Sequence, residues 1–190
     1  MVFKSSFYCL VLFLSLHLSS FAQASLAFES NQIHFNQGKE YFDAQNYVAA
    51  REEFTNFLSR QSDATKNDVI TAEFYQVLCS LYLNQPEIEV LGYHFNLKHP
   101  DSPHSNLLFR KIGLYFYDIA NYVKAIHYLE NSSLGNVEAR YKLGVAYFET
   151  KEMEKALALF NEVKTDPDEE YAFSAAYYAG VIQYQQKNFL

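Results

Sequence analysis

The sequence has little of what disulfide-bonded, β-rich or nucleic-acid-binding proteins require. Its 190 residues include no tryptophan, 2 cysteines, 4 prolines and 6 glycines. So few turn-forming residues disfavour an all-β fold and favour helices. The formal net charge is −7, whereas a nucleic-acid-binding protein normally presents a basic face. The sequence also contains 16 tyrosines and 17 phenylalanines. From these three observations together we expect an aromatic-rich helical protein that binds no nucleic acid.

Catalytic and metal-binding motifs are also missing from the sequence. It contains no Gly-rich phosphate loop, no G-x-S-x-G and no H-E-x-x-H. His94, His99 and His104 follow one another at intervals of five, which neither places them on one helical face nor matches a zinc motif. We therefore expect no catalytic residues, no bound metal and no cofactor.

The first 24 residues are expected to be a secretory signal peptide. Lys4 supplies a short positive region, residues 7–18 are almost wholly apolar, and Ala22 and Ala24 are alternative cleavage sites. The apolar run is shorter than the roughly 20 residues that span a bilayer. The alternatives are a buried apolar helix or an uncleaved anchor. Without this segment Cys79 is the only cysteine, so no disulfide framework is expected in the exported chain.

Residues 141–160 read as two helices joined by a short polar turn. Leu143, Gly144 and Tyr147 mark the first helix, and Ala156 and Phe160 mark the second. Two helices approach closely where each offers a small residue among large apolar ones. The segment therefore predicts a tightly packed helical hairpin in which Gly144 and Ala156 are packing positions.

The same pattern, a helical hairpin with a small residue on each helix, recurs along the rest of the chain. The predicted units lie near residues 31–64, 72–105, 106–136 and 137–170, followed by an incomplete unit at 173–190. The residues at the glycine position are Gly38, Cys79, Gly113, Gly144 and Gly180, with spacings of 41, 34, 31 and 36. A period near 34 residues is typical of tetratricopeptide repeats.

Over residues 31–190 the chain thus resembles the tetratricopeptide repeat family. This resemblance implies an all-α fold, a right-handed superhelical solenoid of helix-turn-helix hairpins. Segments 41–50 and 116–125 share Asp, Asn, Tyr, Val and Ala at the same offsets, and Asn46 and Asn121 are expected to N-cap second helices. The second unit carries Leu91 at the alanine position, and Cys79 at the glycine position is expected to be a buried, inert thiol.

Residues 187–190 resemble the opening of a second helix. No small residue follows at the expected place, and a solenoid needs a polar capping helix over its last apolar face. The pattern therefore predicts the N-terminal part of a longer repeat protein.

The resemblance also implies a concave groove lined by certain positions of the first helices. The expected lining residues are Phe35, Phe42, Arg110, Tyr117, Tyr141, Phe148, Tyr177 and Tyr184. Such an aromatic stripe, with carboxylates beside it, suits a peptide with apolar anchors. The alternative is that these rings pack against the next repeat. The Lys and Asn pattern with which some members of the family clamp a C-terminal carboxylate is absent.

The sequence therefore favours a non-catalytic scaffold that binds a peptide or protein partner in the groove. A signal peptide followed by repeats is similar to the layout of tetratricopeptide repeat proteins of bacterial envelope assembly and division. It implies the periplasm or the outer-membrane periphery of a Gram-negative bacterium, with membrane association through partners. Two alternatives are a docking or sensing region of a larger enzyme or signalling protein, and a small-molecule or glycan binder using the Tyr/Phe groove.

Overall fold

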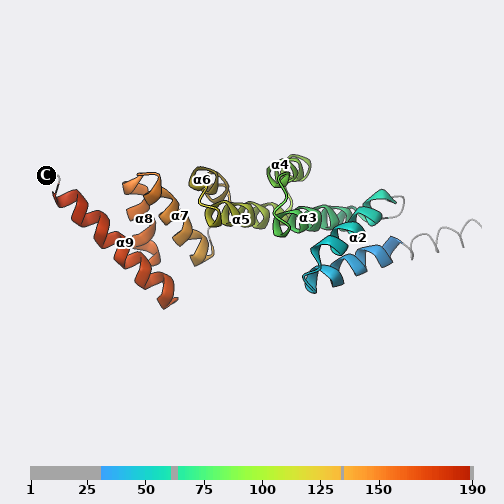
Figure 1. Cartoon of the computed structure of the whole chain (residues 1–190), viewed down its shortest axis with the longest axis horizontal. Coiled ribbons are helices and arrows are strands. Elements are labelled where there is room, and N and C mark those ends of the chain that lie inside the picture. The colour runs from blue at the N-terminus through green and yellow to red at the C-terminus, as the bar shows by residue number, and fades with distance from the viewer. Residues whose placement is uncertain (1–30, 61–63, 134, 189–190) are drawn as a thin grey trace, which may run out of the picture. The chain divides into compact units, whose positions relative to one another are not determined.

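The computed structural model describes residues 31–60, 64–133 and 135–188, and every regular element in these ranges is a helix. The predicted signal peptide, residues 1–24, lies outside the described residues. A helical segment over residues 31–43 is followed by eight labelled helices (Figure 1). These are α2 (Tyr47–Ser59), α3 (Lys66–Tyr82), α4 (Ile88–Lys98), α5 (Pro103–Asp118), α6 (Tyr122–Glu130), α7 (Val137–Glu149), α8 (Met153–Val163) and α9 (Glu169–Asn188).

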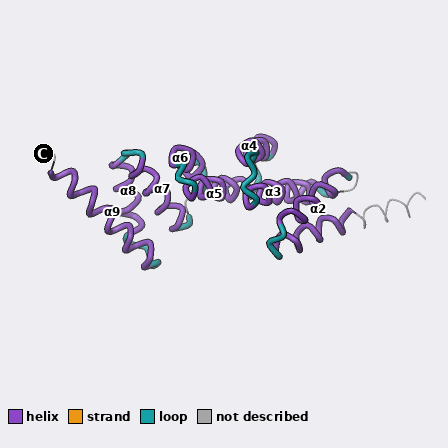
Figure 2. Tube along the Cα trace, in the orientation of Figure 1, coloured by secondary structure: helices purple, strands orange, loops and turns teal. Residues whose placement is uncertain are grey.

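Three of the hairpin turns share one backbone conformation. Gln45, Ala120 and Lys151 have φ of 59°, 57° and 68°, in the left-handed region that commonly ends a helix. In each turn the next residue's N–H donates to a carbonyl five residues earlier, at an N–O distance of 2.8 Å. The connections are short, as the loop segments of Figure 2 show, so each pair of helices is held antiparallel and close.

The predicted N-caps are confirmed at two of these turns. The side-chain oxygen of Asn46 accepts from the N–H of Ala49 at 3.4 Å, and that of Asn121 accepts from the N–H of Lys124 at 3.3 Å. These contacts satisfy backbone donors that the first turn of a helix leaves unpaired. Asn therefore begins the second helix of both hairpins for the reason that the sequence indicated.

The chain forms two compact units, one ending at Leu83 and one beginning at Asn84. The first unit packs residues 31–43, α2 and α3 around an apolar cluster. Its buried members are Phe35, Ala50, Phe54, Phe57, Ala72 and Cys79. A Cβ atom added at Gly38 would lie 2.8 Å from the Phe54 ring, so the glycine is what allows this ring to lie against the helix backbone.

The second unit contains α4 to α9, with hairpins α5–α6 and α7–α8 and with α9 packed on α8. Its core includes Leu129, Leu143, Ala156 and Phe160, all at most 2% exposed. A Cβ atom at Gly144 would lie 2.9 Å from Cε1 of Phe160. Gly144 and Ala156 are therefore packing positions, as the sequence predicted.

Two local expectations were wrong. Lys187 and Asn188 were expected in a turn that opens a second helix, but α9 continues as one helix through Asn188. In α4 the small residue in close contact is Gly92 and not the residue at Leu91: Gly92 is buried, and a Cβ there would lie 2.5 Å from Cδ1 of Ile112. Leu91 is only partly buried, so in α4 the small residue in close contact follows the predicted alanine position by one residue.

Candidate functional site

The first of the expected groove residues, Phe35, lies in the core of the first unit. Its side chain is 7% exposed. The centroid of its ring lies 5.1 Å from that of Phe57 and 6.2 Å from that of Phe54. These contacts stabilise the first unit and leave almost no surface for a partner, which corrects the expectation that Phe35 lines an open groove.

Phe42 and Phe148, from the same position of two different repeats, are partly buried in seams between repeats. The Phe42 ring packs edge-on against Tyr75 of α3, with centroids 4.8 Å apart. The Phe148 ring packs in the same way against Tyr178 of α9, with centroids 5.2 Å apart. In both cases the contact is with the first helix of the following repeat, so the alternative interpretation of these two rings holds.

Tyr117 occupies the corresponding position on α5, where the following repeat presents the cation of Lys142 to its ring. The ammonium nitrogen of Lys142 lies 5.1 Å from the centroid of Tyr117 and 3.0 Å from carboxylate oxygens of both Asp118 and Glu138. Burial, with a smaller contribution from neighbouring tyrosines, raises the pKa of the Tyr117 phenol to about 12. Tyr117 therefore stays protonated at neutral pH and acts as a packing residue.

Tyr141 is partly buried where α7, α8 and α9 meet. Its ring centroid lies 5.3 Å from that of Tyr171, 6.1 Å from that of Phe160 and 6.3 Å from that of Tyr178. Aromatic pairs at such distances add to the stability that burial alone provides. Tyr141 therefore belongs mainly to the seam, with only part of its ring left for contact with a partner.

Two tyrosines that the sequence analysis did not single out organise these seams. Tyr75 stacks on Phe54 with centroids 5.1 Å apart and planes 6° apart. Tyr178 stacks on Phe160 with centroids 5.1 Å apart and planes 13° apart. Each stack joins the second helix of one repeat to the first helix of the next. The recurring contact shows that Tyr75 and Tyr178 are equivalent.

A sequence signal for this equivalence exists in the preceding alanines. Ala72, Ala139 and Ala175 are 0% exposed. They precede the residues at the seam position by three places each, and these residues are Tyr75, Lys142 and Tyr178. Aligning the repeats on these alanines moves the second unit by two residues. Val77, and not Cys79, then occupies the glycine position, which corrects the expected register of that unit.

Cys79 itself is buried, as expected, although in another role. It lies in the core of the first unit and is 0% exposed. Burial raises the pKa of the thiol to about 12, even though the charge of Arg51 acts in the opposite direction. Because the thiolate is the reactive form, Cys79 is not an activated nucleophile.

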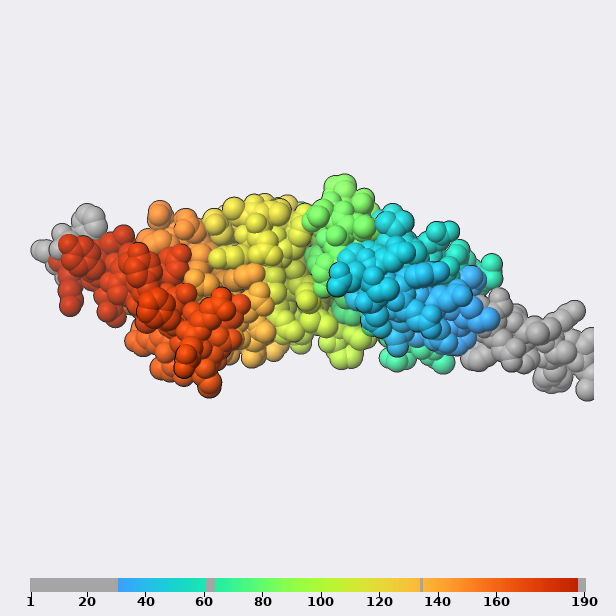
Figure 3. Space-filling model, turned by 60° about the horizontal axis from the view of Figure 1, so that its bottom comes forward, coloured from blue at the N-terminus to red at the C-terminus, as the bar shows by residue number. Residues whose placement is uncertain are grey.

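The last two of the expected groove residues, Tyr177 and Tyr184, are exposed to solvent on α9. Their exposed fractions are 66% and 70%, and they lie seven residues apart on one helix face. They flank a shallow hollow of about 520 Å³ on the surface of α9, which is red in Figure 3. The hollow is lined by Ala176, Tyr177, Gly180, Val181, Tyr184 and Gln185. Arg110, the remaining expected residue, is partly exposed on α5 and is not among these lining residues.

The described residues offer no metal centre and no membrane-spanning segment. Among them, no group of three or more His, Cys, Asp or Glu side chains is placed to hold a metal ion. In the same ranges none of the helices combines the length and the apolar character that crossing a bilayer requires.

The fold by itself defines a class of protein. Hairpins α5–α6 and α7–α8, with a common turn and a recurring seam, are those of an all-α helical repeat protein. Residues 110–170 match the family model described as "Tetratricopeptide repeat", so this part of the chain is similar to tetratricopeptide repeats. No curated protein and no solved structure matches the chain.

Proposed function

We propose that this protein is a non-catalytic scaffold that binds a peptide or protein partner through the aromatic surface of α9. Tetratricopeptide repeats generally mediate protein–protein interaction, and residues 110–170 match the model of this family. The observation that carries the proposal is the pair Tyr177 and Tyr184, two large rings exposed on one face of α9. Tyrosine is enriched among the residues that dominate binding energy at protein interfaces.

The α9 surface suits an apolar anchor of a partner. Between the two tyrosines, a Cβ placed on Gly180 would have no atom of the described residues within 4 Å, apart from its chain neighbours and the backbone of α9, so a side chain can approach the helix backbone there. The rings on either side provide apolar walls, and their hydroxyl groups provide hydrogen bonds at the rim. A leucine- or phenylalanine-sized side chain on a helical or extended segment fits this arrangement.

We further propose that the protein acts in a bacterial cell envelope after export. The support is the N-terminal pattern of a positive residue, a short apolar run and small residues at Ala22 and Ala24. Intact mass spectrometry of the protein recovered from periplasm tests this proposal. Cleavage should produce a chain that begins at Gln23 or Ser25, and recovery of the uncleaved chain in the cytoplasm would contradict export.

Site-specific photo-crosslinking tests the surface itself. A photoreactive residue in place of Tyr184 should capture a partner protein, and Tyr177→Ala should strongly reduce the yield of that adduct. Tyr93→Ala on α4 is the matched control, because Tyr93 is likewise 63% exposed but lies far from α9 in the sequence. Equal loss of the adduct with Tyr93→Ala, or no loss with Tyr177→Ala, would rule out binding through α9.

A further inference from the structure

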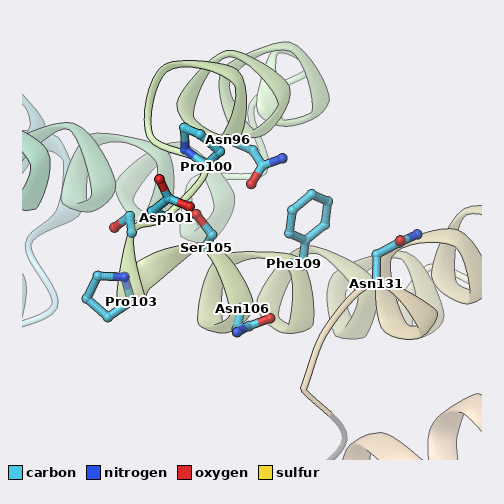
Figure 4. Close-up of a pocket in the computed structure, with 9 residues that line it drawn as sticks. Asn96, Pro100, Asp101, Pro103, Ser105, Asn106, Phe109 and Asn131 are labelled. Carbon is cyan, nitrogen blue, oxygen red and sulfur yellow. The ribbon is translucent and has the colours of Figure 1, made fainter.

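A second hollow, of different character, lies where the end of α4, the start of α5 and the end of α6 meet. Its volume is about 500 Å³, within the roughly 300–1,000 Å³ range of small-molecule sites. Figure 4 shows its lining side chains. The residues that matter here are Asn96, Asp101, Ser105, Asn106, Phe109 and Asn131.

The loop that frames this hollow is held by its own hydrogen bonds. The Ser105 hydroxyl donates to the carbonyl of His99 at 3.1 Å, and the hydroxyl oxygen of Ser102 accepts from the N–H of His104 at 3.2 Å. On the other side, the amide of Asn131 donates to the carbonyl of His127 at 2.7 Å. The frame is therefore preorganised, which lowers the entropic cost of binding.

Several polar groups that reach the hollow are left for a ligand. Within the part of the chain that the structure describes, the side chains of Asn96, Asp101 and Asn106 make no hydrogen bond or ion pair. The carbonyl oxygen of the Asn131 side chain likewise accepts no hydrogen bond from a described residue. Each amide offers two donors and an acceptor, and the Asp101 carboxylate offers acceptors only.

Phe109 supplies the apolar wall. In Figure 4 its ring extends from α5 on the side that faces Asn96. The ring is supported by Tyr128, with centroids 5.7 Å apart, and Tyr128 in turn stacks on Phe116 with centroids 5.6 Å apart. Phe109 is therefore fixed in place, and the part of its ring that is not covered faces the hollow.

The combination of these groups selects a class of ligand. Among the described residues, no lysine or arginine lines the hollow, and Asp101 is the only charged residue that does, so a phosphate or carboxylate ligand would be repelled. Sugar hydroxyls both donate and accept, as the three asparagine amides require, and the C–H face of a sugar ring packs on an aromatic ring. We propose that this hollow is a binding site for a neutral saccharide.

The proposal is independent of the protein-binding surface, because the residues of the hollow lie on α4, on α5, in the loop between them and just after α6, and those of the proposed interface lie on α9. The test uses the whole chain without its first 24 residues and three probes: maltotriose, cellotriose and chitotriose. In ¹⁵N-edited NMR titrations, at least one probe should produce saturable shifts at Asn96, Asn106 and Asn131.

A variant series completes the test. Asn96→Ala combined with Asn106→Ala should weaken this binding by about tenfold, equivalent to ~1.4 kcal/mol. Asn67→Ala on α3, an exposed asparagine outside the hollow, should leave it unchanged. A thermal melt equal to that of the wild type establishes that the double variant is folded. The proposal is overturned if none of the three sugars shifts these residues, if the double variant binds like the wild type, or if the Asn67→Ala variant loses binding equally.

Discussion

Helices α7 and α9 carry the same sequence pattern, but its residues are largely covered in α7 and exposed in α9. Tyr–x–x–Gly–Val is followed three residues later by an aromatic ring in both, as residues 141–148 and 177–184. In α7 the glycine and valine are buried and both rings are partly covered, because α8 and α9 lie against them. In α9 the two tyrosines are at least 66% exposed. The pattern therefore specifies a surface that accepts a helix, and whether this surface is core or interface depends on what lies opposite.

The largest difference in the free energy of unfolding is expected between two truncations, one at the covered face of α7 and one at the open face of α9. Phe160, which is 0% exposed, lies on Gly144 and stacks on Tyr178. Phe160→Ala should destabilise the second unit by about 3–5 kcal/mol. Tyr184→Ala on the open face should change the free energy of unfolding by less than about 0.5 kcal/mol. Urea denaturation followed by circular dichroism measures both, and similar losses would mean that α9 is not open.

The two glycines provide the next contrast. Gly144→Leu adds a side chain where even a Cβ would lie 2.9 Å from the Phe160 ring, and should cost about 1–3 kcal/mol through overpacking. Gly180→Leu meets open space, and leucine favours a helix by up to about 1 kcal/mol over glycine. The two melting temperatures should therefore move in opposite directions.

This second contrast has a matching functional readout. Gly180→Leu fills the hollow between Tyr177 and Tyr184 without harming the fold, so it should reduce the adduct formed by the photo-crosslinker at Tyr184. A stable Gly180→Leu protein that is captured as well as the wild type would place the partner elsewhere on the chain.

A smaller effect is expected at two equivalent lysines. Lys151 lies seven residues after Gly144 and has φ of 68° in the α7–α8 turn, whereas Lys187, seven residues after Gly180, is helical. Lys151→Gly should stabilise the hairpin by about 1 kcal/mol, because glycine adopts positive φ without strain. Lys187→Gly should give no stabilisation. Equal shifts of the two melting temperatures would contradict the different backbone conformations.

The smallest effect concerns the covered ring of Tyr117, which has the same place on α5 as Phe148 on α7. Its pKa is about 12 in the folded chain because of burial, above the value of about 10 in an unfolded chain. The stabilising contribution is thus complete below pH 10 and is lost as the pH rises from 10 to 12. Between these values Tyr117→Phe should reduce the fall in stability by about 1 kcal/mol, after allowance for partial exposure. Parallel stability profiles of the two proteins would show that Tyr117 does not contribute.

Much of the local structure could be predicted from residue types and spacing. Asn46 and Asn121 begin helices because their side chains can reach the N–H three residues later, a short-range contact. Gly144 and Ala156 were recognised as packing positions because small residues recur among large apolar ones. The same reasoning failed in the second predicted unit, where Cys79 was given the glycine position. Ala72 indicates the register of this unit only once the contact between Tyr75 and Phe54 shows which alanines to align.

The candidate surfaces were less accessible to prediction. Phe35, Tyr141 and Tyr177 occupy one position of the repeat, yet the first is core, the second lies in a seam and the third is open. The polar hollow at Asn96, Asn106 and Asn131 joins residues from α4, from α5 and from the end of α6, and no sequence motif marks it. Sites of this kind depend on how helices meet, which short-range patterns do not encode.

The amino-acid sequence by itself determined the helical repeats, their turns and the residues able to accept a neighbouring helix, because helix periodicity, capping and glycine spacing act within a few residues. Only the tertiary structure decided which of those faces are covered. Burial requires a second element opposite, and identical faces at Gly144 and Gly180 differ because Phe160 of α8 lies on one, whereas no atom of the described chain fills the space at the other.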